Sequence, residues 1–397
     1  MNRKVLSIAL LGFAALARMG SALAQCAIQE TPAATLLLPY FEVDLSTGYG
    51  KNTQVTVGNA FYSPVLVEAV VWSDLGVPIF SFDIYLNGYQ DVQFDLRTIL
   101  EYGTLPQTAP PSGSYPSCQG TMPPAQISWS NLGIYQAALT GQQAQPGPGP
   151  GYFCAGRNLG DTIARGYITF DTANVCTLQI PSDPGFFTSG GQGNYSNNNT
   201  LYGDFAYVNN STSQAEGHPL VHLVADASAT QLSVAGNYTF YGKFDGWTAN
   251  DNREPLATEF AARYVPAGTD LIVWRDSKVK QGWFNCNTLP SWYPLGQEGL
   301  WDMADSGTYA SLNTLKPFGA VAQRVHVGGA TLPVPYSSGW LYMDLNTYVA
   351  AAGYNPPVDY TVSQAWVLTS STIAGDATIG NPAIRYDSAC RPRHYGP

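Results

Sequence analysis

Aromatic side chains are the most prominent group in this sequence of 397 residues, which contains 9 tryptophans and 25 tyrosines. Four aromatic residues lie close together in a stretch that also carries proline and glycine: Trp283, Trp292, Tyr293 and Trp301. Aromatic rings in loops can stack their flat faces on sugar rings, whereas aromatic residues on strands fill the core of a β protein. The cluster therefore predicts a carbohydrate-binding site, and core packing is the alternative interpretation of the same residues.

A second group of residues offers oxygen ligands for a metal ion. Asp245, Asn250 and Asp251 lie in one short segment, which also contains glycine. Calcium takes roughly six to eight oxygen ligands and tolerates the geometry of a loop. The segment lacks the ligand order and the trailing glutamate of an EF-hand, so a solvated turn is the alternative. We treat these three residues as a candidate calcium site and expect no other cofactor.

Histidines and paired acids give no clear catalytic motif, and the patterns G-x-S-x-G and H-E-x-x-H are absent. His218 and His222 are the most metal-like pair. Pro219 opposes a helix between them, and on a strand they would lie about 13 Å apart. Glu42 and Asp44 have the spacing of a carboxylate pair for glycoside cleavage, but such pairs are also common on solvated strands. The sequence favours a non-enzymatic protein, with a glycoside hydrolase or another hydrolase as the alternative.

The N-terminus has the features of a secretory signal peptide. Arg3 and Lys4 precede an apolar run from Val5 to Ala17, and a small-residue cleavage pattern ends at Ala24. The run is too short to span a bilayer. We therefore predict that residues 1–24 are removed on export and that the mature protein is secreted or periplasmic.

The charge of the chain excludes some partners. Charged residues make up 12% of the sequence, about half the usual share. The formal net charge is −10, and loss of the signal peptide leaves 15 positive against 28 negative residues, a balance of −13. A chain this acidic does not favour nucleic acid or anionic membrane surfaces. No later segment is long and apolar enough for a transmembrane helix.

The cysteine count fits an exported protein. An even number of cysteines in an oxidising compartment favours disulfide bonds, here three, and the sequence leaves their pairing open. No two of them form a C-x-x-C motif, which opposes zinc-ribbon and thioredoxin-type chemistry. The six residues are Cys26, Cys118, Cys154, Cys176, Cys286 and Cys390.

The elements that must position these residues are mainly strands. Thr53–Val57, Phe80–Leu86 and Val92–Leu96 alternate polar and apolar residues, which is typical of half-buried strands. Turn signals recur at intervals of roughly 8 to 12 residues, as in antiparallel sandwiches. We predict a mainly β protein with two antiparallel, Ig-like β-sandwich domains that are linked by disulfides. The three helices that we expect are short: Ser130–Leu139, Pro255–Arg263 and Tyr309–Leu315.

Two pairs of segments indicate an internal duplication. Gly166–Asp171 has a near copy in Gly339–Asp344, with apolar side chains at the third and fifth positions and aspartate at the sixth. Thr269–Trp274 similarly resembles Thr53–Val57. Chance similarity between β-rich segments is the alternative. A true duplication predicts two domains of related topology.

Composition divides the mature chain into three parts. We predict an N-terminal sandwich domain over residues 25–185, with a long Pro/Gly-rich loop at 142–151. Residues 186–252 connect the domains and contain strand-like segments of their own. A C-terminal sandwich domain follows over residues 253–397.

Several segments resemble an uncharacterised family of secreted bacterial β-rich proteins. The similarity covers most of the mature chain and implies a bacterial source and export, but that family has no established activity from which a catalytic residue could be transferred. The segments are Leu37–Leu45, Val71–Pro78, Phe82–Tyr89, Tyr202–Phe205, Arg253–Leu256, Thr269–Asp276, Tyr293–Gly296 and Asp387–Cys390.

These observations together predict an extracytoplasmic, non-enzymatic protein with a structural or surface-binding role. We expect its partner to be a polysaccharide or a cell-surface component. A carbohydrate-binding module that uses loop aromatics is the first alternative, and a hydrolase is the second.

Overall fold

A computed structural model describes most of the chain from residue 31 to residue 385. It places 22 helices and strands in this part of the chain, and nearly all of them are strands. The described residues are 31–108, 126–142, 153–177, 179–181, 183, 185–186, 194–225, 239–241, 252–265, 268–276, 284–285, 299–345, 364–373 and 377–385.

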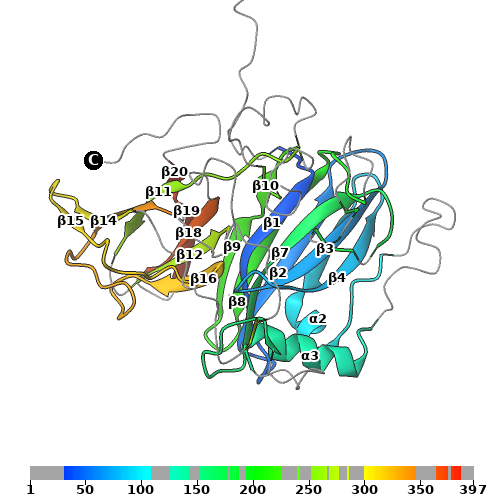
Figure 1. The fold of residues 1–397 in the computed structure, drawn as a ribbon, viewed down its shortest axis with the longest axis horizontal. Helices are drawn as coiled ribbons and strands as arrows, with labels where there is room; N and C mark the ends of the chain where they lie inside the picture. Colours follow the sequence, from blue (N-terminus) through cyan, green and yellow to red (C-terminus); the bar gives the residue numbers. More distant parts are fainter. Residues whose placement is uncertain are drawn as a thin grey trace, which may run out of the picture.

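The first half of the chain forms two antiparallel sheets, which we call the N-terminal unit (Figure 1). The five-stranded sheet has the order β10-β1-β7-β3-β4, and the four-stranded sheet has the order β5-β2-β8-β9. The strands are β1 (Thr35–Asp44), β2 (Lys51–Asn59), β3 (Val65–Ser73), β4 (Pro78–Leu86), β5 (Asp91–Asp95), β7 (Ile163–Ala173), β8 (Leu201–Asn209), β9 (Gln214–Pro219) and β10 (Val221–Leu223).

The second half forms another pair of antiparallel sheets, the C-terminal unit. Its five-stranded sheet has the order β15-β14-β17-β11-β20, and its four-stranded sheet has the order β16-β12-β18-β19. The strands are β11 (Glu259–Tyr264), β12 (Thr269–Arg275), β14 (Gly299–Ala304), β15 (Tyr309–Ser311), β16 (Ala322–His326), β17 (Gly339–Asp344), β18 (Ala365–Ile373), β19 (Ala377–Pro382) and β20 (Ile384–Arg385).

The two units repeat one topology. Each of the nine strands in the N-terminal unit has a counterpart at the same sheet position in the C-terminal unit, and the counterparts follow one another in the same chain order. For β1, β2, β3, β4, β5, β7, β8, β9 and β10, the counterparts are in turn β11, β12, β14, β15, β16, β17, β18, β19 and β20. The sequence pairs found above fall on equivalent strands, because β7 corresponds to β17 and β2 to β12. The strand order therefore confirms two halves of related topology, and it adds β8–β10 of the predicted connecting region to the N-terminal unit.

The turn after β3 and the turn after β14 repeat in detail. Gly76 and Gly307 both adopt the left-handed conformation, with φ of 79° and 85°. In each turn the glycine N–H donates to the carbonyl three residues earlier, that of Ser73 or Ala304, at 3.0 Å. A residue with a Cβ would be strained at this position, which explains why glycine stands at the same place in both turns.

Two further pairings and two helices complete the described chain. β6 (Phe153–Cys154) pairs with β13 (Phe284–Asn285). Helix α2 (Leu96–Tyr102) begins at the N-cap Asp95 and ends at Gly103, and α3 (Trp129–Leu139) begins at Ser128. The sequence predicted α3 but missed α2, although Asp95 and Gly103 are standard helix-capping residues.

Two predicted helices are strands instead. Glu259–Tyr264, which overlaps the second half of the expected helix at 255–263, is β11 and pairs with β17 along its whole length. Tyr309–Ser311, inside the expected helix at 309–315, is β15 and pairs with β14. Such short segments contain too few apolar residues for their spacing to separate a helix from a strand, and pairing with neighbouring strands decides the outcome.

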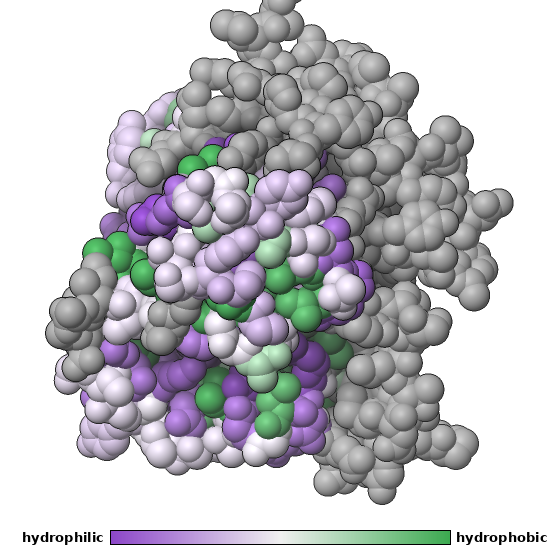
Figure 2. Space-filling view, turned by 90° about the vertical axis from the view of Figure 1, so that its left-hand side faces the viewer, coloured by the Kyte–Doolittle hydropathy of each residue, from purple (hydrophilic) through white to green (hydrophobic). Residues whose placement is uncertain are grey.

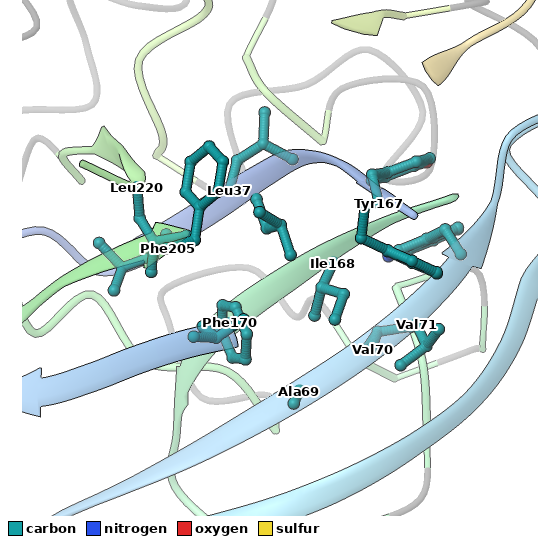
Figure 3. Packing of buried hydrophobic residues seen from close by; sticks show 14 of the residues in the cluster. Leu37, Ala69, Val70, Val71, Tyr167, Ile168, Phe170, Phe205 and Leu220 are labelled. Atoms are coloured by element: carbon teal, nitrogen blue, oxygen red, sulfur yellow. The ribbon is translucent and has the colours of Figure 1, made fainter. Parts of the chain in front are cut away.

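Each pair of sheets encloses a buried core. In the N-terminal unit, Phe94 of the four-stranded sheet meets Phe170 of the five-stranded sheet with ring centroids 6.1 Å apart. Figure 3 shows Phe170 and Ile168 on β7 beside Ala69 of the neighbouring strand β3. The C-terminal core contains Leu271, Leu300 and Leu341 among others. Burial of these apolar faces is the main force that holds each pair of sheets together.

The four-stranded sheet of the C-terminal unit is buried on both faces. Leu271 and Val273 on β12 belong to the C-terminal core, whereas the alternating Ile272 and Trp274 belong to the core cluster of the N-terminal unit. Leu368 on β18 joins them there. The outer face of this sheet therefore packs directly on the N-terminal unit.

A buried aspartate also ties the two units together. The main-chain carbonyl of Asp74 accepts from the N–H groups of Val321 and Ala322 at 3.0 and 3.1 Å. Its carboxylate pairs with Arg157 at 2.6 Å, and Arg157 in turn donates to Gln323 at 3.3 Å. The turn after β3 is thus a fixed contact point for the strand β16.

Several predictions fall on parts of the chain for which the structure gives no description. They include the signal peptide, residues 143–151 of the loop predicted at 142–151, and Cys26, Cys118, Cys286 and Cys390. Cys176 packs against Leu66 and Ala173, and no cysteine with a described side chain is a free thiol. Within the described ranges, no helix is both long and apolar enough to cross a membrane.

Candidate functional site

The outer face of the five-stranded sheet in the C-terminal unit carries an aligned row of large side chains. Met303 on β14 lies opposite both Tyr309 on β15 and Trp340 on β17. Trp340 lies opposite Arg263 on β11. Directly opposed residues on neighbouring strands point to the same face of a sheet. The row therefore crosses four strands on the side that faces away from the C-terminal core.

A second row runs beside the first. Trp301 lies two residues before Met303 on β14 and opposite Tyr342 on β17, and their ring centroids are 5.5 Å apart. Because residues two apart on a strand share a face, the two rows form one surface. We call it the aromatic face, and it consists of Arg263, Trp301, Met303, Tyr309, Trp340 and Tyr342.

Solvent reaches most of the aromatic face. Tyr309 is 66% exposed, and Trp301, Met303 and Trp340 are half-buried. Tyr342 is buried, and its hydroxyl donates to Glu259 at 2.8 Å. Figure 2 views the molecule from the side on which β14 and β15 lie, and the apolar patches there are small and separated by polar ones. The exposed rings are thus available to a ligand that also offers polar groups.

Charged groups border the rings. The guanidinium of Arg263 lies 5.9 Å from the ring centroid of Trp340, a distance at which a cation is attracted by the π face. Arg263 also pairs with Asp305 at 3.2 Å, and both side chains are well exposed. The Arg263–Asp305 pair therefore supplies a donor and an acceptor at the edge of the aromatic surface.

Beneath the face, a buried hydrogen bond fixes the sheet. The hydroxyl of Tyr264 on β11 donates to Asp302 on β14 at 2.7 Å, on the core side of the sheet. Burial raises the pKa of the Asp302 carboxyl, and the Tyr264 bond opposes this rise. The bond spans β17, so it helps to hold three strands of the platform in register.

The equivalent face of the N-terminal unit is covered. Trp72 on β3 lies opposite Tyr167 on β7, in the positions that Met303 and Trp340 occupy in the other unit. Their rings stack with centroids 5.5 Å apart and an interplanar angle of 2°. Tyr167 also contacts Trp274 of the C-terminal unit at 5.9 Å. The same surface of the fold is therefore an interface in one unit and open in the other.

The open face carries more aromatic rings than the covered one. This is the reverse of what core filling would require, since the covered positions are the ones that need bulk. At four equivalent positions the covered face has Val70, Trp72, Tyr167 and Thr169, and the open face has Trp301, Met303, Trp340 and Tyr342. The open face thus has three aromatic rings where the covered face has two.

The structure describes one of the four predicted carbohydrate-binding residues. Trp301 lies on a strand and forms part of the aromatic face, whereas Trp283, Trp292 and Tyr293 lie outside the described residues. The sequence missed Trp340, because its alternating strand looks like a core strand. The signal that could have found it is the repeat, since Tyr167 occupies the same place in Gly166–Asp171.

The candidate calcium residues Asp245, Asn250 and Asp251 also lie outside the described residues. In the part of the chain that the structure covers, no group of three or more His, Cys, Asp or Glu is placed to hold a metal ion. His218 lies within β9 and bonds to Glu216 at 2.6 Å. His222 on β10 bonds to the carbonyl of Thr31.

A serine, a glutamate and a histidine do meet where the two units join. Ser370 donates to one carboxylate oxygen of Glu216, and Nε2 of His218 bonds to the other. A catalytic triad needs the histidine next to the nucleophile, with the acid behind it. Here the carboxylate stands between them, so His218 is not placed to take a proton from Ser370.

Paired acids in the N-terminal unit are closed to substrates. Glu68 and Asp83 lie directly opposite each other on β3 and β4, and both side chains are fully buried. Burial raises the pKa of Asp83 to about 7, although a backbone contact with Thr177 opposes the rise. Burial and nearby acids also raise the pKa of Glu68. These buried carboxyls influence stability and offer no open cleft for glycoside cleavage.

Comparison with known proteins gives no relative: no protein-family model, no curated protein and no solved structure matches the chain.

Proposed function

We propose that this protein binds polysaccharide through the aromatic face. The observation that carries the proposal is the row of Tyr309, Met303 and Trp340, which lies open on a regular sheet. Neighbouring strands are about 4.8 Å apart, so a row that crosses four strands is about 14 Å long. That length exceeds a single sugar ring and suits an extended chain laid across the strands.

The chemistry of the face supports a glycan as the occupant. Sugar rings present apolar C–H groups that stack on aromatic rings, and their hydroxyls both donate and accept hydrogen bonds. The Arg263–Asp305 pair offers both partners at the edge of the face. A purely apolar ligand would leave this pair without a role.

The surroundings of the protein are part of the proposal. The signal-like N-terminus and six cysteines support an extracytoplasmic protein of two disulfide-bearing, sandwich-like domains. Cell-wall or extracellular polysaccharides are the sugar polymers that such a protein meets.

A pull-down on insoluble polysaccharides, with affinity electrophoresis for soluble ones, tests this proposal. Trp340→Ala and Tyr309→Ala should each lower retention on the bound polysaccharide about tenfold, which corresponds to about 1.4 kcal/mol. Trp129→Ala is the matched control, because Trp129 is 75% exposed on α3 in the other unit. If no polysaccharide retains the wild type, or if the control loses as much as Trp340→Ala, the proposal is wrong.

The repeat favours structural assembly as a second candidate function. In the N-terminal unit the equivalent face is covered by protein, so the open face could receive another subunit. The positions on the N-terminal unit that match the covering sheet are polar, with Thr56 and Asp204 where the covering sheet has Ile272 and Leu368. A repeat of the same contact between copies is therefore disfavoured. Light scattering at high concentration decides, because assembly through this face predicts oligomers that Trp340→Ala abolishes.

A further inference from the structure

A polar cleft opens where the two units meet, on the opposite side of the C-terminal core from the aromatic face. Its volume is about 170 Å³. Both units contribute to its walls, and ligand sites often form at such junctions. Its charged lining residues are Glu42, Lys51, Glu216, Asp270 and Arg324, and its lining hydroxyls are those of Tyr207, Ser370, Thr372 and Thr378.

Acids and bases alternate along the cleft. Glu42 binds Lys51 through one carboxylate oxygen at 3.0 Å and Arg324 through the other at 3.4 Å. Arg324 also pairs with Asp270 at 3.3 Å. Three acids face two bases, so the lining carries a net charge of −1 before any ligand binds. Both cations already have carboxylate partners, which leaves little attraction for an anionic ligand.

The walls of the cleft are held in place by buried contacts. The guanidinium of Arg324 lies 4.9 Å from the ring centroid of Tyr207, whose hydroxyl donates to the carbonyl of Tyr40 at 2.8 Å. On the other wall, Ser370 and His218 both bond to Glu216. Burial favours a higher pKa for Glu216, but these two hydrogen bonds lower it, so the group stays ionised at neutral pH. A site fixed in this way loses little entropy when a ligand binds.

We propose that this cleft binds one neutral sugar or a similar polyol of monosaccharide size. Each hydroxyl of such a ligand donates to a carboxylate and accepts from an ammonium or guanidinium group, which matches the alternation of the lining. The volume is well below the roughly 300 Å³ at which drug-sized ligand pockets begin, so the cleft suits a single ring. Side chains of Asn209, Gln214 and Thr378 add neutral partners at the rim.

This site goes beyond the polysaccharide proposal and does not rest on it. The cleft and the aromatic face share no residue, and the four-stranded sheet with the C-terminal core separates them. A ligand in the cleft would contact both units at once. Its binding should therefore stabilise the whole protein against thermal unfolding.

Titration by NMR and thermal unfolding test the cleft with five probes: glucose, galactose, N-acetylglucosamine, the cationic glucosamine and the anionic glucuronate. At least one neutral sugar should bind with a Kd of about 1 mM, the affinity expected for a ligand this small. Thr372→Trp places an indole at the exposed rim of the cleft and should abolish binding. Lys51→Ala removes an exposed donor and should weaken binding about fivefold.

The controls separate this site from the aromatic face. Thr98→Trp adds the same bulk at an exposed position of α2 and should leave sugar binding unchanged, as should Trp340→Ala. Binding that survives Thr372→Trp would place the sugar elsewhere and overturn the assignment. A response to glucosamine or glucuronate alone, or to none of the five probes, would equally reject a neutral-sugar site.

Discussion

The indole of Trp301 occupies the space above Gly299. A Cβ at Gly299 would lie 1.9 Å from Cζ3 of Trp301, closer than any real contact. The missing side chain therefore lets the ring lie flat along its own strand. A related contact joins Gly58 and Tyr202, which lie opposite each other on β2 and β8 of the N-terminal unit; there a Cβ would lie 2.4 Å from Cζ of the tyrosine ring. Glycine paired with an aromatic residue is thus a recurrent way to present a ring face on these sheets.

Gly299→Ala should tilt Trp301 away from the aromatic face and lower polysaccharide retention about tenfold without unfolding the protein. The new methyl group meets the side chain of Trp301 within the sheet, and the ring is half-buried and free to move outward. Tryptophan fluorescence and the pull-down measure the two effects. Gly133→Ala on α3 is the control, since a Cβ there meets nothing within 4 Å, and it should leave retention unchanged. Full retention by Gly299→Ala would show that the flat ring is unimportant.

Asp74 and Asp305 occupy the same place in two equivalent turns, but only Asp74 lies at the contact between units. Asp74→Ala removes a buried carboxylate from Arg157 and should lower the free energy of unfolding by about 2 kcal/mol. Asp305→Ala removes an exposed partner of Arg263 and should cost less than about 0.5 kcal/mol. Urea unfolding compares the two variants directly. An equal decrease in the free energy of unfolding for both variants would mean that the aspartate stabilises the turn itself and not the contact between units.

Asp83 should make the protein less stable as pH rises. Burial raises its pKa from 3.8 to about 7, so between these values the native state holds a proton that the unfolded chain has released. The free energy of unfolding therefore falls from pH 4 to pH 7, by up to about 4 kcal/mol, and this loss persists above pH 7. Urea unfolding at several pH values measures how steeply the free energy of unfolding falls with pH, and this slope should be smaller for Asp83→Asn than for the wild type. The exposed control Asp204→Asn should keep the wild-type slope, and a slope that Asp83→Asn leaves unchanged would contradict the assignment.

The sequence predicts the strands better than their arrangement. Alternation identifies most of β2 and β4, and the motif at Gly166–Asp171 and Gly339–Asp344 anticipates the two equivalent strands β7 and β17. The strand order is invisible in the sequence, because pairings such as β1 with β10 join residues far apart in the chain. The helix predicted at 255–263 fails for a related reason, since contacts on both sides of β11 override local spacing.

The candidate site was only partly predictable. Trp301 stands out because it follows a segment rich in aromatic and turn residues. Trp340 and Tyr309 do not stand out in the sequence, because the residues around them do not distinguish an exposed sheet face from a covered one. Only the comparison of equivalent positions, such as Tyr167 with Trp340, reveals that one face is free.

All six cysteines should be oxidised in the exported protein. The mature protein isolated from its native source should begin at Gln25 and contain no free thiol under denaturing conditions, and six thiols should appear after reduction. Cys176 packs beside Leu66 and Ala173 at the edge of the N-terminal core, so a bond there ties a buried strand to another segment. Reduction should therefore lower the free energy of unfolding by roughly 2–5 kcal/mol for each bond lost. Thiol titration and intact mass measure the count, and protein made in a reducing cytoplasm is the matched control. Six free thiols and an uncleaved N-terminus in the native protein would remove the extracytoplasmic setting on which the polysaccharide proposal depends.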